Sequence, residues 1–340
     1  MDAWFSLADD EKRGYCEAAA AELGLDALSI EKDFWVCWLL RDVFALPQTG
    51  PHLTFKGGTS LSKCWKLISR FSEDLDIVIG RDFLGFGGDK APETAPSNKQ
   101  RDARLEELKD ACRTYVQSTL ASELTAQLRS RLPKEVVWKL ETDPSDPDGQ
   151  SLLFVYPSAF SRGSYLSPGV KLEFGARSDT EPHASPEIQS YLAEALPGEF
   201  ARAKFTVRAV APERTFWEKA MLLHEEGFST KPEPRPRMAR HYYDVWSLIR
   251  AGIAEKALAT PGLFESVAQH RAIFFRKKKE AQDSLRPGSL RILPSADRRR
   301  AWEQDYEAMQ AAMFFRPPPS FDEILQTVGE FESTFNREHR

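Results

Sequence analysis

Cysteine is scarce in this chain, and its few copies are scattered. Four cysteines occur in 340 residues, at Cys16, Cys37, Cys64 and Cys112. They form no C-x-x-C pair, and their wide separation does not match the spacing of a zinc site or a disulfide framework. We therefore expect reduced and mostly buried thiols.

Long apolar runs are also missing. No stretch of about 18 apolar residues occurs, so no transmembrane helix is expected. Residues 1–16 intersperse acids and bases, whereas a secretory signal peptide places a basic segment before an apolar one. The sequence thus predicts a cytoplasmic protein with no membrane partner.

Neither sign of charge is in large excess. The formal net charge is -5, with 46 basic and 51 acidic side chains. This balance argues against a surface coated in basic groups, but it does not decide whether the protein binds nucleic acid. The length, with 41% apolar residues and no visible internal repeat, predicts one large folded domain or two of ordinary size.

The chain does contain a closely spaced acidic pair in residues 55–79. Period-two alternation places Leu75 and Ile77 on one face of a strand and Asp74 and Asp76 on the other. Two like charges side by side repel each other unless a cation lies between them. Oxygen ligands favour Mg2+, which commonly takes one or two carboxylates together with substrate phosphates. The pair therefore predicts a magnesium site.

The residues just before this strand predict a phosphate-binding turn. Gly57, Gly58, Thr59 and Ser60 follow an apolar strand and open a helix that also carries Lys63. Glycines let the backbone approach an anion at a helix N-terminus, and the two hydroxyls can donate to phosphate oxygens. We predict that these five residues contact a nucleotide. A surface hairpin with a solvated acidic strand end is the alternative.

The composite motif resembles a known family. GGTSLSK followed by RFSEDLDIVI resembles the first motif of the nucleotidyltransferase superfamily and, more narrowly, that of AbiEii-type toxins of bacterial type IV toxin-antitoxin and abortive-infection systems. IEKDFWVCWLLRDVF, VKLEFGAR, ERTFWEKAMLLH and RHYYDVWSL are also similar to that family, so the resemblance covers roughly residues 29–250.

The resemblance implies an α+β fold. Its core would be a DNA polymerase beta-like nucleotidyltransferase domain, a small mixed sheet with helices, followed by a mainly helical C-terminal part. We place the nucleotidyltransferase domain with its N-terminal helices at residues 1–210, and a helical domain that contributes Lys219 to the site at residues 211–340.

A third acid comes from the middle of the chain. In the predicted strand 170–176, Glu173 lies on the polar face next to Lys171. Together with Asp74 and Asp76 it would complete the acid set of two-metal phosphoryl chemistry, binding the second metal and taking the proton of the attacking hydroxyl. This role follows mainly from the resemblance, and a solvated Lys171 and Glu173 face is the alternative.

A predicted helix at residues 212–227 carries Lys219 at the edge of its apolar face. The stem of such a lysine can be buried while its ammonium reaches a ligand. The Glu218-Lys219 pair matches a signature of the family, which makes Lys219 the predicted triphosphate contact. A lysine that only extends to solvent is the alternative.

Asp244 lies on the next helix, among aromatic residues, and is expected to need a partner. Arg240, one turn earlier, is the nearest candidate. Many family members have an acid three residues before this Asp, but His241 stands there in this chain. That departure leaves open whether Asp244 takes part in catalysis or only holds the lysine helix.

Two further charged segments are interpreted conservatively. Residues 29–46 predict a helix with Ser29 as its N-cap, and Glu31, Lys32 and Asp33 are interpreted as an ordinary charged helix start. An approach of these three residues to the nucleotide, which the resemblance suggests, is the alternative. The basic clusters at 274–282, which include residues 276–279, and at 297–300 predict solvated helix faces or, near a nucleotidyltransferase site, a surface for an RNA backbone.

These observations predict a Mg2+-dependent nucleotidyltransferase, in which an acceptor hydroxyl attacks the α-phosphorus of an NTP and pyrophosphate leaves. The resemblance suggests a tRNA 3' end as acceptor, growth arrest as outcome and a cognate antitoxin encoded nearby. Modification of a protein hydroxyl and non-catalytic binding of a nucleotide or RNA are the alternatives. A metal-dependent nuclease is a weaker one, since it leaves the glycine turn and Lys219 without a role.

Overall fold

The structure is a computed structural model that describes residues 1–340 except 73, 161–167, 201–203, 276–277, 315–316 and 339–340. The chain forms two compact units, Met1–Cys64 with Glu73–Ala209 and Trp65–Ser72 with Val210–Arg340. The predicted assignment of a nucleotidyltransferase domain to residues 1–210 and of a helical domain to residues 211–340 stays a prediction.

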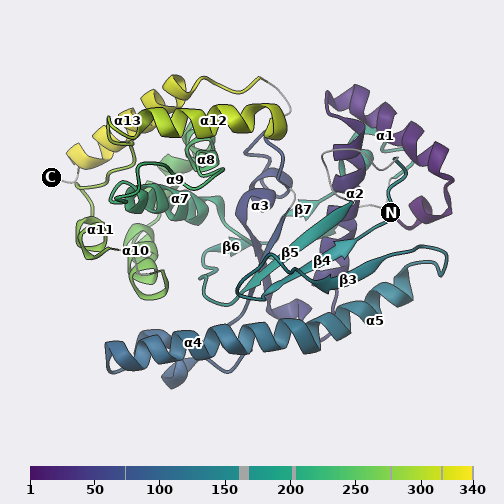
Figure 1. Cartoon of the computed structure of the whole chain (residues 1–340), viewed down its shortest axis with the longest axis horizontal. Helices are drawn as coiled ribbons and strands as arrows, with labels where there is room; N and C mark the ends of the chain where they lie inside the picture. The colour runs from purple at the N-terminus through teal and green to yellow at the C-terminus, as the bar shows by residue number, and fades with distance from the viewer. Residues whose placement is uncertain (73, 161–167, 201–203, 276–277, 315–316, 339–340) are drawn as a thin grey trace. The chain divides into compact units, whose positions relative to one another are not determined.

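The first unit is built on a mixed sheet (Figure 1). Seven strands follow the order β3-β4-β5-β2-β1-β9-β6. β1 runs antiparallel to β2, β2 runs parallel to β5, and β4 runs antiparallel to both β3 and β5. The strands are β1 Leu53–Lys56, β2 Leu75–Ile79, β3 Lys139–Thr142, β4 Ser151–Val155, β5 Gly169–Gly175, β6 His183–Ala184 and β9 Ala209–Val210, while β7 Glu187–Ile188 and β8 Phe205–Thr206 form a separate pair.

Among the described residues, the α-helices of this unit are α1 Asp9–Leu23, α2 Ala27–Phe44, α3 Gly57–Lys63, α4 Asn98–Tyr115, α5 Ala121–Arg131 and α6 Tyr191–Ala195. A single π-helical turn, Val116–Leu120, joins α4 to α5, and Figure 1 shows the two as one long rod along the sheet. α2 is apolar nearly all round, as expected for a helix buried on several sides. Its Trp35 and Trp38 rings lie 5.8 and 6.4 Å from the ring of Phe154 in β4.

The second unit is mainly helical. Its helices are α7 Pro212–Glu226, α8 Arg240–Arg250, α9 Ile253–Ala259, α10 Leu263–Phe274, α11 Lys279–Ser284, α12 Arg299–Met313 and α13 Phe321–Glu338. Trp217 of α7 is fully buried, with its ring 5.0 Å from Phe264 and 5.4 Å from Phe335. The segment Trp65–Ser72 joins this unit through a bridge between Arg70 and Phe314. Among the described helices, none is long and apolar enough to cross a membrane.

The predicted fold class, a mixed sheet with helices followed by a mainly helical C-terminal part, is confirmed. Residues 205–210 form two short strands, because β8 pairs with β7 whereas the carbonyl of Arg208 accepts a bond from the Phe55 amide of β1. One local prediction was wrong. Ser29 is not the N-cap of α2: the cap is Asp26, whose carboxylate accepts from the Ser29 amide at 2.9 Å.

Candidate functional site

The glycine turn and the acidic strand pack directly against each other. Lys56, the last residue of β1, lies opposite Asp76 of β2, and α3 begins with Gly57 at φ +79°. A Cβ on Gly57 would lie 1.9 Å from Oδ2 of Asp76. Two features therefore require glycine at this position: the left-handed backbone conformation, and the Asp76 carboxylate, which leaves no space for a Cβ.

Thr59 holds the start of the acidic strand. Its hydroxyl donates to the backbone carbonyl of Asp74 at 2.6 Å, and its side chain is fully buried. Ser60 is also buried. The sequence interpretation directed both hydroxyls to phosphate, but the structure gives that of Thr59 a backbone partner. The turn therefore fixes the backbone at Asp74.

Asp76 and Glu173 are neighbours across two parallel strands. The register of β2 and β5 pairs these two residues, and both Asp74 and Asp76 are half-buried. The Glu173 carboxylate lies 2.7 Å from Nζ of Lys171, which is also 3.2 Å from Asp143. Burial alone would lower the pKa of Lys171, but its hydrogen bonds to these two carboxylates raise it. Glu173 thus has a cationic partner on its own strand.

Within the described part of the chain, no group of three or more His, Cys, Asp or Glu side chains converges as a metal site. Among the described residues, Asp74, Asp76 and Glu173 therefore do not form a preformed metal site. Magnesium does not need one, since it usually binds one or two carboxylates and takes its other ligands from water and substrate phosphates. Asp74 and Asp76 are the pair that suits this mode.

Lys63 has a different partner from the one that we predicted. Its ammonium lies 2.6 Å from the Asp33 carboxylate of α2 and 3.6 Å from the ring centre of Tyr191, and its side chain is only 4% exposed. Burial would lower the pKa of Lys63, but the Asp33 charge raises it. Lys63 therefore joins α3 to α2, and we remove it from the proposed nucleotide contacts.

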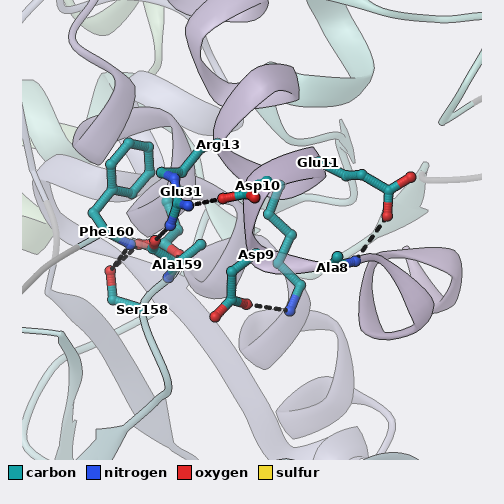
Figure 2. Close-up of polar contacts among 10 residues, drawn as sticks. Ala8, Asp9, Asp10, Glu11, Arg13, Glu31, Ser158, Ala159 and Phe160 are labelled. Atoms are coloured by element: carbon teal, nitrogen blue, oxygen red, sulfur yellow. Dashed lines mark hydrogen bonds and ion pairs between the residues drawn. The ribbon is translucent and has the colours of Figure 1, made fainter.

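The charged start of α2 was also interpreted incorrectly, because its side chains are not solvated. Glu31 is 2% exposed and accepts bonds from the Ser158 hydroxyl at 2.5 Å and from the Ala159 amide at 2.6 Å (Figure 2). Arg13 of α1 donates to the Ala159 carbonyl. Burial raises the pKa of Glu31, and these hydrogen bonds oppose it. Glu31 thus ties the chain after β4 to the two N-terminal helices.

In the second unit, one buried carboxylate faces two cations. Asp244 of α8 is fully buried, and its oxygens lie 2.7 and 2.8 Å from the Arg70 guanidinium and 2.8 Å from the Lys219 ammonium. Burial would raise the pKa of Asp244, but the Arg70 and Lys219 charges hold it well below its usual range. The predicted partner, Arg240, was wrong: these ion pairs come from α7 and from the segment Trp65–Ser72.

Lys219 is more deeply buried than an edge position suggests. It is 8% exposed, and its ammonium lies 3.4 Å from Nδ1 of His241. Burial lowers the pKa of Lys219 although Asp244 opposes this, and burial together with the Lys219 charge holds the pKa of His241 well below its usual value. A neutral histidine at this position leaves Asp244 as the anion of the cluster.

The geometry agrees with the comparison to known families. The family model for the nucleotidyl transferase AbiEii toxin, of type IV toxin-antitoxin systems, matches residues 38–327. The chain belongs to the AbiEii family. It is thus a nucleotidyltransferase and a toxin of a type IV toxin-antitoxin system.

Two further comparisons add little to this AbiEii assignment. The nucleotidyltransferase toxin MenT4 from Mycobacterium tuberculosis is similar in structure, with a TM-score of 0.44 and 17% identity over 97% of this chain and 99% of that one. This likeness is too distant to transfer residues or substrates. No curated protein sequence matches the chain.

Sequence reasoning missed the roles of Arg70 and Asp33. Arg70 lies five residues before β2, and Asp33 lies in a helix that we interpreted as charged at its start. Their partners are 174 and 30 positions away, which no local periodicity can reveal. Of the predicted basic run, Lys278 and Lys279 are exposed, whereas Arg276 and Lys277 lie outside the described residues.

Proposed function

We propose that this AbiEii nucleotidyltransferase transfers a nucleoside monophosphate from an NTP to an RNA hydroxyl, that of a tRNA 3' end, in a Mg2+-dependent reaction. The close packing of Gly57 against the Asp76 carboxylate is the observation that carries this proposal. A site that keeps a carboxylate against a bare glycine backbone brings a metal ligand and a phosphate-binding turn together.

Magnesium fits the residues that are present. Asp74 and Asp76 offer oxygen ligands only, both are half-buried, and the missing Cβ of Gly57 makes room for the Asp76 carboxylate. Bound there with the substrate phosphates, Mg2+ would neutralise the charge that develops on the transferring phosphoryl group.

Protein groups of the site transfer the proton and orient the phosphates. The 3' hydroxyl oxygen attacks the α-phosphorus, its proton passes to the Glu173 carboxylate, and the bond to pyrophosphate breaks. The backbone of Gly57 and Gly58, with Ser60, orients the phosphates. Positioning of this kind, together with charge stabilisation, supplies most of the rate in phosphoryl transfer.

Lys219 is proposed as a triphosphate contact, and Asp244 as the residue that positions it. An ammonium has three donors, and Lys219 directs one of them to a carboxylate that also binds Arg70. Lys219 and Arg70 together carry two positive charges and Asp244 carries one negative charge, so the cluster has a net positive charge that favours a phosphate nearby. Asp244 then acts by holding the lysine, and touches neither substrate nor metal itself.

Incubation of the purified chain with each α-labelled NTP, total tRNA and Mg2+ tests the proposal. We expect the label in RNA, at the 3' end, and suppression by the cognate antitoxin. Label found in protein instead would support the alternative acceptor, a protein hydroxyl. Absence of incorporation with all four NTPs, by a preparation that binds NTP, would contradict transferase activity.

A further inference from the structure

A preformed pocket lies in the second unit, beside the buried cluster of Arg70, Asp244 and Lys219. Its volume is about 370 Å³, within the range of ~300–1,000 Å³ typical of ligand sites. Ser69 and Tyr243 line it, and each directly neighbours in sequence a member of that cluster, Arg70 and Asp244. The proposed function assigns nothing to this pocket.

Hydrogen bonds fix the walls of the pocket. The Ser247 hydroxyl of α8 donates to the Leu67 carbonyl at 2.5 Å, and the Ser69 amide donates to the Tyr243 hydroxyl at 3.2 Å. Both bonds tie the segment Trp65–Ser72 to α8. The bridge between Arg70 and Phe314 ties the same segment to the chain that follows α12.

Three aromatic rings line the pocket. The Tyr243 ring centre is 5.7 Å from that of Trp246, at an interplanar angle of 32°, and 4.8 Å from that of Phe314, at 77°. Tyr243 is buried, whereas Trp246 and Phe314 are half-buried and thus keep part of their surface accessible. Pro317–Pro319 completes the apolar side.

The charge at this pocket is of one sign. Lys66 and Arg250 both line it and both are exposed, while no carboxylate does so among the described residues. Lys66 has φ +53°, a left-handed backbone that a non-glycine residue adopts only at a cost. Strain of this kind is concentrated at functional sites.

We infer that this pocket binds one unpaired nucleotide of a single-stranded RNA, with its base against Trp246 and Phe314 and its phosphate at Lys66 and Arg250. Stacking on aromatic rings beside a basic rim is how proteins hold single strands without reading their sequence. A basic peptide would need carboxylates to pair with its lysine and arginine side chains, and the described lining has no carboxylate. The inference rests on the proposed function, for which it names a subsite of the acceptor strand.

The test is binding of a short fluorescein-labelled oligoribonucleotide to the full chain, measured by anisotropy without NTP over a salt series. Trp246→Leu should weaken binding by about fivefold to 150-fold, the range for loss of one stacked base. Lys66→Ala with Arg250→Ala should flatten the log-log salt slope by about 0.7 for each lost phosphate contact. Trp138→Leu and Arg129→Ala, a half-buried tryptophan and an exposed arginine of the first unit, are matched controls and should change neither quantity.

Arg250→Glu guards against a folding artefact, because an exposed side chain can be reversed in charge with little effect on stability. It should weaken binding while the melting temperature stays at the parent value. Unchanged affinity in both Trp246→Leu and Arg250→Glu would overturn the inference. So would a proline-rich peptide that binds the pocket as tightly as the oligoribonucleotide does. Asp76→Ala should keep this binding, so failure of the proposed chemistry is seen separately, as loss of label incorporation.

Discussion

Gly57→Ala tests the contact between the glycine turn and the acidic strand. The new methyl group would lie 1.9 Å from Oδ2 of Asp76 and 2.6 Å from its Cγ. To restore an ordinary contact of 3.4 Å, the carboxylate or the turn must move by about 1.5 Å. We expect the carboxylate to rotate away and the backbone of the turn or of the strand to shift as well, because the added methyl group would also lie 2.9 Å from Cβ of Asp76, which side-chain rotation cannot move.

Two effects of this substitution have different sizes. An L-residue at φ +79° destabilises the fold by about 1–2 kcal/mol. Displacement of a catalytic group by ~1 Å lowers a rate by ~100-fold, so we expect nucleotide transfer to fall by at least about that factor. The loss of activity should therefore be far larger than the loss of stability alone would cause.

Gly85→Ala is the matched control, since Gly85 has φ +86° and a Cβ added there would have no atom within 4 Å. It introduces the backbone strain without the clash. We expect a melting temperature for Gly57→Ala at or below that of Gly85→Ala, measured by thermal unfolding, and near-parent transfer of α-labelled NTP for Gly85→Ala only. Parent-like transfer by Gly57→Ala would refute the proposed role of this contact.

The other predictions concern the buried charges. Asp244→Asn should destabilise the chain by about 3–5 kcal/mol at pH 7, because it leaves two buried cations without an anion. The folded-state pKa of Asp244 is lowered, so its contribution to the free energy of unfolding is complete above the unfolded-state pKa of about 3.9 and is lost as the pH falls. In urea unfolding, the difference in free energy of unfolding between the parent and Asp244→Asn should therefore become smaller below about pH 4. Lys63→Met should destabilise by a similar amount, be partly rescued by Asp33→Asn, and leave the KM for NTP unchanged; a raised KM at unchanged stability would restore Lys63 as a nucleotide contact. Lys219→Ala should reduce transfer strongly while Lys219→Arg retains part of it, and an effect on the melting temperature alone would make this lysine structural.

Sequence reasoning succeeded where the interacting residues are close along the chain. Only one short helix and a loop separate Asp76 from the glycines before it in the chain. A local pattern of two strands joined through the glycine turn was therefore enough to predict that the turn and the acidic strand belong to one site. The register of Glu173 beside Asp76 needed a parallel pairing of distant strands, which period-two alternation does not encode. The resemblance to a family supplied that residue.

It failed where a charge is buried against a distant partner. Glu31 was interpreted as part of a charged helix start, Lys63 as a nucleotide contact, and Asp244 as the partner of Arg240 one turn earlier, because local spacing offers only neighbours on the same helix. Their partners lie on other elements, and burial of both members of a pair depends on how those elements pack. The N-cap of α2 was missed for a simpler reason: Asp26 and Ser29 are both good caps, and the structure uses the earlier one.

The central claim is that Asp74 and Asp76 support Mg2+-dependent nucleotide transfer, and Asp76→Ala tests it most directly. Transfer from α-labelled NTP to RNA would be measured over a Mg2+ titration, with the melting temperature recorded without metal. We predict loss of transfer at every Mg2+ concentration, because one of the two proposed carboxylate ligands is removed, in a variant that still unfolds in a single cooperative transition. A variant that keeps full Mg2+-dependent transfer would contradict the account.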